Sequence, residues 1–221
     1  MAAPSNTRES LHTLAEHVLS PARHRATGRI GLRRTPGGFG TPFFASEHGD
    51  RRVRINGTDL VVEDERGERH EAITTVRAAA AFAEIEAGAP IEVYTPSTSL
   101  DLDAALPLDA AEAALLADWY RLVDDALALL RAEAGADDGI VQLWPEHFDL
   151  AVTLDEVNYG GSLGDKEHPT PYLYVGPWAP PTPDGGFWNE PFGSSLASSQ
   201  VETTQDALNY FRRGQSVLSS R

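Results

Sequence analysis

A long amphipathic segment between residues 109 and 134 constrains the fold of this chain more than any other feature. Its apolar side chains recur every three or four residues, which places them on one face of an α-helix. The stripe consists of Ala113, Leu116, Trp119, Tyr120, Val123, Leu127 and Leu130. Gly135 follows the stripe and is a typical helix end. We therefore predict one long central helix whose stripe belongs to a hydrophobic core rather than to a cofactor pocket.

Short segments with the period of a β-strand lie on both sides of this helix. Before it, Val53 and Ile55 alternate with arginines, and Asn56-Gly57 supplies a turn that leads into a second apolar run. Further strands are predicted at 91–94, 140–144, 147–154, 156–160 and 172–176.

Three more helices are predicted from apolar spacing and from residues that begin or end helices. They run from Asn6 or Thr7 to about Leu19 before Pro21, from Thr74 or Thr75 to Ala87 before Gly88, and over about Thr203–Leu218. Residues 95–108 are expected to be a polar linker, and 177–200 a loop-rich surface stretch. The fold class is thus α+β: a single domain over residues 1–221 with antiparallel sheet regions packed against three or four helices.

The chain has no cysteine, which excludes disulfides, thiolate zinc sites, iron–sulfur clusters and thiol nucleophiles. Residues 1–10 lack the apolar region of a signal peptide, and no apolar run approaches the roughly 20 residues of a membrane-spanning helix. We predict a cytoplasmic bacterial protein without a membrane partner.

The formal net charge of −15 is unevenly distributed. Residues 1–77 contain 12 arginines against 10 Asp and Glu, whereas the rest contains 6 Arg and Lys against 23. This acidic balance argues against nucleic acid as a partner, because nucleic-acid binders present basic surfaces. The N-terminal arginines are expected to pair with acidic helices or to be solvated: Arg23, Arg25, Arg29, Arg33, Arg34, Arg51, Arg52 and Arg54.

The segment from Trp144 to Leu154 is the best candidate for chemistry. In a strand, Phe148, Leu150, Val152 and Leu154 would share one face, which we assign to the core. His147 and Asp149 would then stand two residues apart on the other face, where a carboxylate can orient an imidazole. We predict His147 and Asp149 as catalytic or ligand-binding residues.

A glycine-containing loop after this segment supplies further candidates, because functional residues concentrate on such loops. The predicted ligand-binding residues are Asn158, Asp165, His168, Tyr172 and Tyr174. Two histidines and several carboxylates could also form a metal centre, although no known metal motif is present. Metal, metal-free pocket and purely structural roles all stay open, and no cofactor is assigned.

Other motifs are weaker. The Gly-rich stretch Thr35–Pro42 has neither the phosphate-loop nor the dinucleotide pattern and is expected to be a loop. No Gly-x-Ser-x-Gly elbow occurs. His12 and His17 lie five residues apart, so we expect them to be solvated rather than paired on one helix face.

Two hypotheses of function follow. The first is a small-ligand-binding protein, or an enzyme of unknown reaction, with its site around His147 and Asp149. The second is an interaction or scaffold protein that uses the aromatic surface Tyr172–Phe192, because Tyr and Trp are common interface anchors. The oligomeric state is not predicted.

Several segments resemble an uncharacterised, mainly actinobacterial family known only as a domain of unknown function. The likeness covers about residues 10–180 and is strongest at 143–153, with the pattern Trp-Pro-x-His-Phe-Asp-Leu-Ala, and at 157–172. Members of the family are longer at the N-terminus, where this chain has Thr35–Pro42 instead. The resemblance implies no activity. It implies that the family's most recognisable stretch includes His147, Asp149, Gly164, Asp165 and Pro169.

Overall fold

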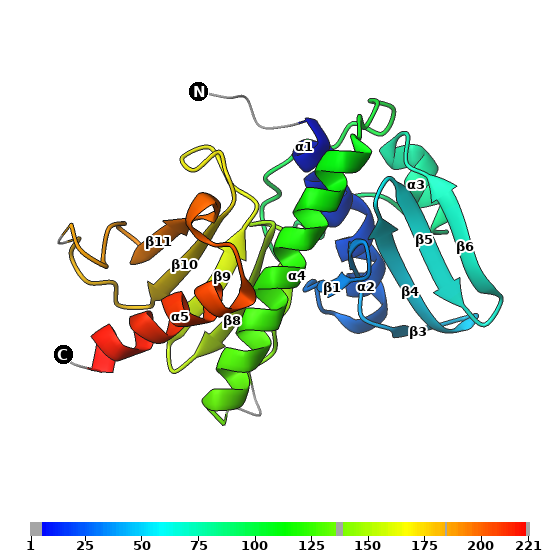
Figure 1. Ribbon diagram of the computed structural model, residues 1–221. Helices are drawn as coiled ribbons and strands as arrows, with labels where there is room; N and C mark the ends of the chain where they lie inside the picture. The colour runs from blue at the N-terminus through cyan, green and yellow to red at the C-terminus, as the bar shows by residue number, and fades with distance from the viewer. Residues whose placement is uncertain (1–5, 136–138, 184, 220–221) are drawn as a thin grey trace. The chain divides into compact units, whose positions relative to one another are not determined.

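The computed structural model describes residues 6–135, 139–183 and 185–219 (Figure 1). The chain folds into two compact units, each containing antiparallel strands. Among the described residues, the N-terminal unit comprises 6–118 and 143–148, and the C-terminal unit comprises 119–135, 139–142, 149–183 and 185–219. The predicted α+β class with antiparallel sheets and one long helix is confirmed. The single domain stays a prediction.

The first helical segment continues past Leu19, where its end was predicted. It consists of α1 (Asn6–Leu14), a π-helical turn η1 (Ala15–Leu19) and α2 (Ser20–Thr27). Pro21 lies inside this continuous helical segment, directly after the π-helical turn, and the carbonyl of His17 four residues earlier accepts instead from the N–H of Gly88 at 3.0 Å. The segment ends instead at Gly28, which adopts a left-handed φ of 70°.

The sheet of the N-terminal unit has the strand order β1-β2-β4-β5-β6, and β3 pairs with β4. The turn between β4 and β5 lies one residue later than predicted: Asn56 is the last residue of β4 and pairs with Asp59, and Gly57, with a φ of 60°, and Thr58 form the turn. Strand β6 lies outside the predicted strands because its sequence has no apolar alternation, yet its backbone pairs with β5 over six residues. The strands are β1 (Arg33–Thr35), β2 (Gly38–Gly40), β3 (Phe44–Ser46), β4 (Gly49–Asn56), β5 (Asp59–Asp64) and β6 (Gly67–Ala72).

Two arginines of β4 pair across the strands with carboxylates. Arg52 donates to both Glu63 oxygens, at 2.9 and 2.6 Å, and Arg54 contacts Glu63 and also Glu68, at 3.2 Å. Burial raises the pKa of the Glu63 carboxyl, but the hydrogen bonds from Arg54 and Arg52 outweigh it and lower the pKa overall. These arginines therefore pair with strand carboxylates rather than with acidic helices.

Helix α3 (Val76–Phe82) begins at the predicted cap, since the Thr75 side chain accepts a hydrogen bond from the N–H of Ala78 at 3.1 Å. It ends at Phe82, five residues before the predicted end. The strand predicted at 91–94 is wrong: the segment is a turn in which the N–H of Val93 donates to the carbonyl of Pro90 at 2.9 Å. Ile91 is 76% exposed, so no apolar face fixes an extended backbone there.

The segment before α4, predicted to be a linker, is held against η1 by the buried Glu16. Its side chain is fully buried and accepts hydrogen bonds from the N–H groups of Ser97 and Thr98, both at 2.8 Å. The Thr98 hydroxyl donates to it at 2.6 Å. One carboxylate thus satisfies three donors of a loop that has no secondary structure to satisfy them.

The two histidines expected to be solvated are enclosed, so that prediction is wrong. His17 accepts from the N–H of Ala89 at Nδ1, at 3.2 Å, so its Nε2 is the donor to the carbonyl of Thr98, also at 3.2 Å. His12 stacks on Phe148 with ring centroids 4.8 Å apart and donates to the carbonyl of Pro145 at 2.8 Å. These partners lie far away in the sequence, so the helical spacing of the histidines could not reveal them.

We expect the N-terminal unit to lose stability as the pH falls below about 6.5. Burial lowers the pKa of His12, against the opposing effects of Glu16 and of the bond to Pro145. Between the two pKa values of His12, the unfolded chain binds a proton that the folded chain does not. The free energy of unfolding therefore falls by up to about 1.4 kcal/mol per pH unit as the pH drops from the unfolded pKa towards the lower folded pKa. Urea denaturation from about pH 7.5 to about pH 5.5 should show a smaller decline for His12→Gln than for the wild type. Equal declines would assign the pH dependence to other groups.

The C-terminal unit contains most of a sheet with the order β11-β10-β9-β8-β7. Helix α4 (Ala110–Glu133) enters this unit at Trp119, and β7 leaves it after Gln142. The elements are β7 (Gln142–Trp144), β8 (Asp149–Leu154), β9 (Val157–Ser162), β10 (Tyr172–Pro177), β11 (Ser194–Ala197), the 3-10 turn η2 (Ser198–Gln200) and α5 (Thr204–Ser219). Strand β11 lies inside the stretch predicted to be loop. No described helix is both long and apolar enough to cross a membrane.

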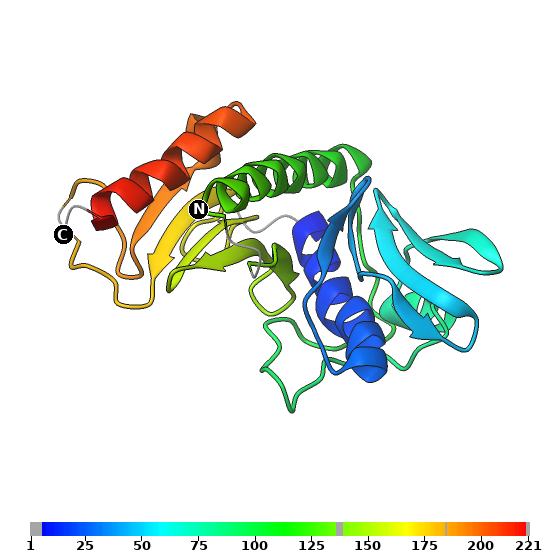
Figure 2. The same ribbon diagram turned by 90° about the horizontal axis from the view of Figure 1, so that it is seen from below.

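In Figure 2, α5 and the part of α4 in this unit lie along one face of the sheet. Gly161 of β9 lies so close to Val123 of α4 that an added Cβ would come within 2.5 Å of Val123 Cγ2. Val175 of β10 packs similarly against Gly214 of α5. Alternate residues point to the other face, here called the outer face: Asp149, Ala151, Thr153, Asn158, Gly160, Ser162, Tyr172, Tyr174, Gly176 and Ser195.

Candidate functional site

His147 and Asp149 do not lie on one strand. Strand β8 begins only at Asp149, and His147 is exposed in the turn 145–148. Phe148 closes this turn with a φ of 52°, and its N–H donates to the carbonyl of Trp144 at 2.8 Å. The strand alternation proposed for His147 is therefore wrong. Because His147 belongs to the N-terminal unit and Asp149 to the C-terminal unit, their pairing stays a prediction.

Asp149 lies on the outer face and is reached by a tyrosine from two strands away. The Tyr174 hydroxyl of β10 donates to Asp149 Oδ2 of β8. Tyr174 stands opposite Gly160 of the intervening strand β9, and a Cβ there would lie 2.6 Å from the Tyr174 hydroxyl. The glycine thus lets the ring pass over β9. Burial and then the charge of Asp149 raise the pKa of Tyr174 well above its usual value, so the phenol stays a donor.

Asp165 organises the loop between β9 and β10. Its Oδ1 accepts hydrogen bonds from the N–H groups of Glu167 and His168, at 2.8 and 2.7 Å, and its Oδ2 accepts from the Tyr172 hydroxyl at 2.7 Å. Burial raises the pKa of Asp165, but these hydrogen bonds outweigh it and lower the pKa overall. Asp165 is therefore a carboxylate at neutral pH, and burial keeps the pKa of Tyr172 high.

His168 joins this loop to the segment before β11. Its Nε2 donates to Glu190 Oε1 at 2.9 Å, since an ionised carboxylate can only accept. The Ser195 hydroxyl of β11 donates to the same oxygen at 2.7 Å. Neither Glu190 nor Ser195 was among the predicted site residues. Glu190 lies in the glycine- and aromatic-rich stretch Gly185–Gly193, and Ser195 follows it, but no motif in that stretch singles out either residue.

Four aromatic side chains form a closed set, here called the four-ring cluster: His168, Tyr172, Tyr174 and Phe192. Each ring contacts two others. The centroids of His168 and Tyr172 are 4.8 Å apart, and those of Tyr172 and Tyr174 are 6.4 Å apart. Phe192 closes the set, because its ring centroid lies 6.5 Å from that of Tyr174 and 6.4 Å from that of His168. Asp149, Asp165 and Glu190 each bond to one of these rings.

The structure thus brings together four of the five predicted ligand-binding residues, together with Asp149. The fifth, Asn158, lies on the outer face opposite Gly176 and accepts a hydrogen bond from Thr153 at 2.7 Å. Among the described contacts it touches none of the four rings. The described residues also contain no group of three or more His, Cys, Asp or Glu that could hold a metal ion.

Three comparisons with known proteins found no match for this chain. No family model matches the chain, no curated protein matches it, and no solved structure matches it. The resemblance to the actinobacterial family accordingly stays a prediction. The chemistry of the four-ring cluster must be inferred from its own side chains.

Proposed function

We propose that this protein binds a small organic cation at the four-ring cluster, with a quaternary ammonium as the recognised group. The observation that carries the proposal is the closed set of four rings with three carboxylates bonded to it. This is a specific form of the small-ligand-binding function predicted from the sequence.

Aromatic faces carry negative electrostatic potential and attract a cation within about 6 Å of the ring centroid. Neighbouring centroids in the cluster are 4.8–6.5 Å apart, which is the spacing of rings in direct contact, so a cation would lie against the exposed side of the cluster at Phe192 rather than between the rings. The three carboxylates add net negative charge. The loop's own cation, Lys166, is exposed and makes no ion pair within the described part of the chain.

The hydrogen bonds of the cluster favour a cation without N–H groups. Both Asp165 oxygens already accept hydrogen bonds. Asp165 Oδ1 and Glu190 Oε1 each accept two hydrogen bonds, so these two oxygens contribute charge without a free acceptor position. A primary ammonium must replace its hydration with acceptors, whereas a methylated ammonium needs only charge and apolar contact.

The proposal is tested by comparing choline with its neutral isostere 3,3-dimethylbutan-1-ol. In a ¹H–¹³C NMR titration that observes aromatic groups, choline should shift the Tyr172, Tyr174 and Phe192 resonances saturably. The isostere should bind at least about 5-fold more weakly, which corresponds to about 1 kcal/mol for the charge. Equal affinities would mean that the rings bind only apolar groups, and the absence of any saturable shift would refute the proposal.

We expect Phe192→Leu to weaken choline binding about 3- to 10-fold, because it removes one ring without removing a hydrogen bond. Phe192 is 36% exposed, so a leucine there should leave folding nearly unchanged. The matched control is Trp178→Leu, which removes an aromatic side chain that is 65% exposed and contacts no ring of the cluster within the described residues. Equal losses in the two variants would contradict a site at the four rings.

The alternative, a protein-interaction surface along Tyr172–Phe192, stays a prediction. Its support is the exposure of Trp178 and Phe192. An oligomer in light scattering, disrupted by Trp178→Leu and unaffected by choline, would favour this alternative over ligand binding.

A further inference from the structure

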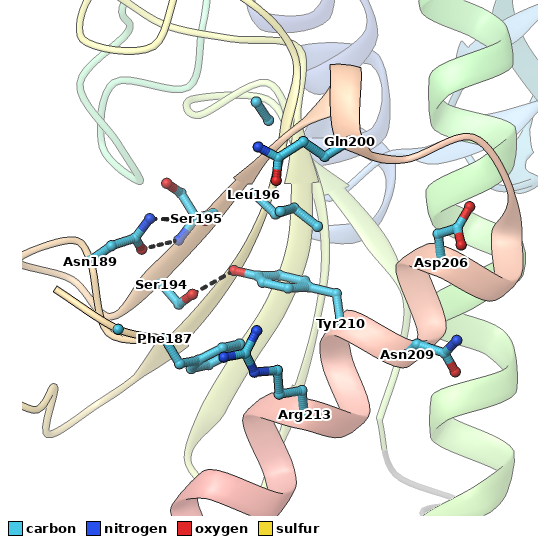
Figure 3. A pocket seen from close by; sticks show the side chains of 12 residues that line it. Phe187, Asn189, Ser194, Ser195, Leu196, Gln200, Asp206, Asn209, Tyr210 and Arg213 are labelled. Carbon is cyan, nitrogen blue, oxygen red and sulfur yellow. Dashed lines mark hydrogen bonds between the residues drawn. The ribbon is translucent and has the colours of Figure 1, made fainter.

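A cavity of about 630 Å³ lies in the C-terminal unit between β11, the edge strand of the sheet, and α5 (Figure 3). Its volume is within the roughly 300–1,000 Å³ of small-ligand pockets. Gly186, Phe187, Asn189 and Gln200 of η2 complete its walls, and none of the four rings lines it.

The cavity contains one cation, Arg213 of α5. Its guanidinium carbon lies 5.1 Å from the centroid of the buried Phe187 ring, and Figure 3 shows the two side chains together at one end of the cavity. The neighbouring Arg212 is engaged by Glu133, with Nε 2.9 Å from Oε2. No carboxylate of the described residues pairs with Arg213 in this way. Stacking on Phe187 instead orients its planar donor groups.

Asp206 is the one carboxylate among the described residues that line the cavity, and it is engaged elsewhere. Its Oδ2 accepts hydrogen bonds from the N–H and the hydroxyl of Thr203, at 2.9 and 2.8 Å, and from the N–H of Glu202 at 3.2 Å. The Thr203 N–H group and hydroxyl lower the pKa of Asp206, the hydroxyl most. This is a capping arrangement at the start of α5, and among the contacts of the described residues Asp206 forms no ion pair with Arg213.

Two neutral polar side chains of the cavity, Ser194 and Asn209, have donors left for a ligand. The Tyr210 hydroxyl donates to Ser194 Oγ at 2.9 Å, which leaves the Ser194 hydroxyl hydrogen to be donated (Figure 3). Burial raises the pKa of Tyr210 and keeps it protonated. The Asn209 oxygen accepts from Gln205 at 2.9 Å, so the amide nitrogen is its remaining polar group. An acceptor-rich ligand suits such a lining.

We infer that this cavity binds a small organic acid, with the carboxylate at Arg213 and the apolar body against Phe187 and Leu196. A guanidinium binds a carboxylate through two parallel hydrogen bonds. One cation matches the single charge of a carboxylate better than the −1.5 to −2 charge that is typical of a phosphate monoester at about pH 7. The inference does not depend on the four-ring cluster, because the two sites have opposite charge preferences and share no ligand group.

The test uses phenylacetate as the probe, with phenylacetamide and phenyl phosphate as matched ligands. In a ¹H–¹⁵N titration of the full chain, phenylacetate should shift the resonances of Ser194–Ala197 and Asn209–Arg213 saturably. Phenylacetamide should bind at least about 10-fold more weakly, since it lacks the charge that makes the hydrogen bonds strong. Phenyl phosphate should also bind more weakly than phenylacetate.

Arg213→Met keeps a long apolar stem over Phe187 and should weaken phenylacetate binding by about 10-fold or more. The control Arg212→Met should change it less than about 2-fold, and both variants should bind choline like the wild type. Undiminished binding to Arg213→Met, equal binding of phenylacetamide, tighter binding of phenyl phosphate, or an absence of saturable shifts would each overturn the inference. Loss of choline binding alone would refute the proposed function and leave this site intact.

Discussion

Glu16→Gln is expected to lower the free energy of unfolding of the N-terminal unit by about 3–5 kcal/mol, a large part of the stability of a typical domain. In the wild type, one Glu16 oxygen accepts from the N–H of Ser97, and the other accepts from the N–H and hydroxyl of Thr98. A glutamine places an NH₂ group where one of these oxygens was. At least one buried donor then faces another donor, and the remaining bonds lose their charge assistance.

Urea denaturation gives the overall loss, and hydrogen exchange locates it. The amides of Ser97 and Thr98 should lose most of their protection in Glu16→Gln, because their acceptor is weakened or gone. Glu71→Gln is the matched control, since Glu71 is exposed on β6. We expect it to change stability by less than about 0.5 kcal/mol. Unchanged exchange at residues 97 and 98 would show that Glu16 does not hold this segment.

Gly193→Ala is expected to destabilise the C-terminal unit by about 2–5 kcal/mol. Gly193 has a φ of 139°, a conformation that residues with a side chain rarely adopt. An added Cβ would also lie 2.2 Å from the carbonyl oxygen of Val175 in β10. Since that atom belongs to the backbone of the neighbouring strand, the clash is relieved only if β11 moves away from β10.

Gly185→Ala is the control for a positive φ without a steric clash. Gly185 also has a positive φ, of 75°, but no atom lies within 4 Å of a Cβ built there. It should therefore show only the conformational cost, about 1 kcal/mol. Thermal or urea unfolding of both variants measures the difference, and equal effects would mean that contact with β10 is unimportant.

A displacement of β11 should also alter both sites. Ser195 donates to Glu190 at the four-ring cluster, and Ser194 accepts from Tyr210 in the cavity. Gly193→Ala is therefore expected to weaken binding of choline and of phenylacetate together, whereas Phe192→Leu and Arg213→Met should each affect one ligand.

Local patterns in the sequence were sufficient for much of the secondary structure. Residues within a few positions of one another decide the stripe of α4, the turn after Asn56 and the Thr75 cap. A short stretch of sequence is therefore enough to predict each of them. Strand β6 was not predicted because its pairing with β5, rather than its own sequence pattern, makes it a strand. The turn at 91–94 was predicted as a strand, but its exposed Ile91 gives it no buried face. The predicted strand start at His147 failed because Phe148 adopts a positive φ.

By itself, the sequence determined the α+β class and identified the loop and strand that carry Asp165, His168, Tyr172 and Tyr174. Only the tertiary structure decided which side chains meet. Tyr174 reaches Asp149, 25 residues earlier, because strand register places Gly160 between them. Glu16 meets Ser97 81 residues later, and the cavity joins β11 to α5. The spacing of apolar residues indicates which residues share one face of a helix or strand. The contacts named here form instead between separate elements that pack together.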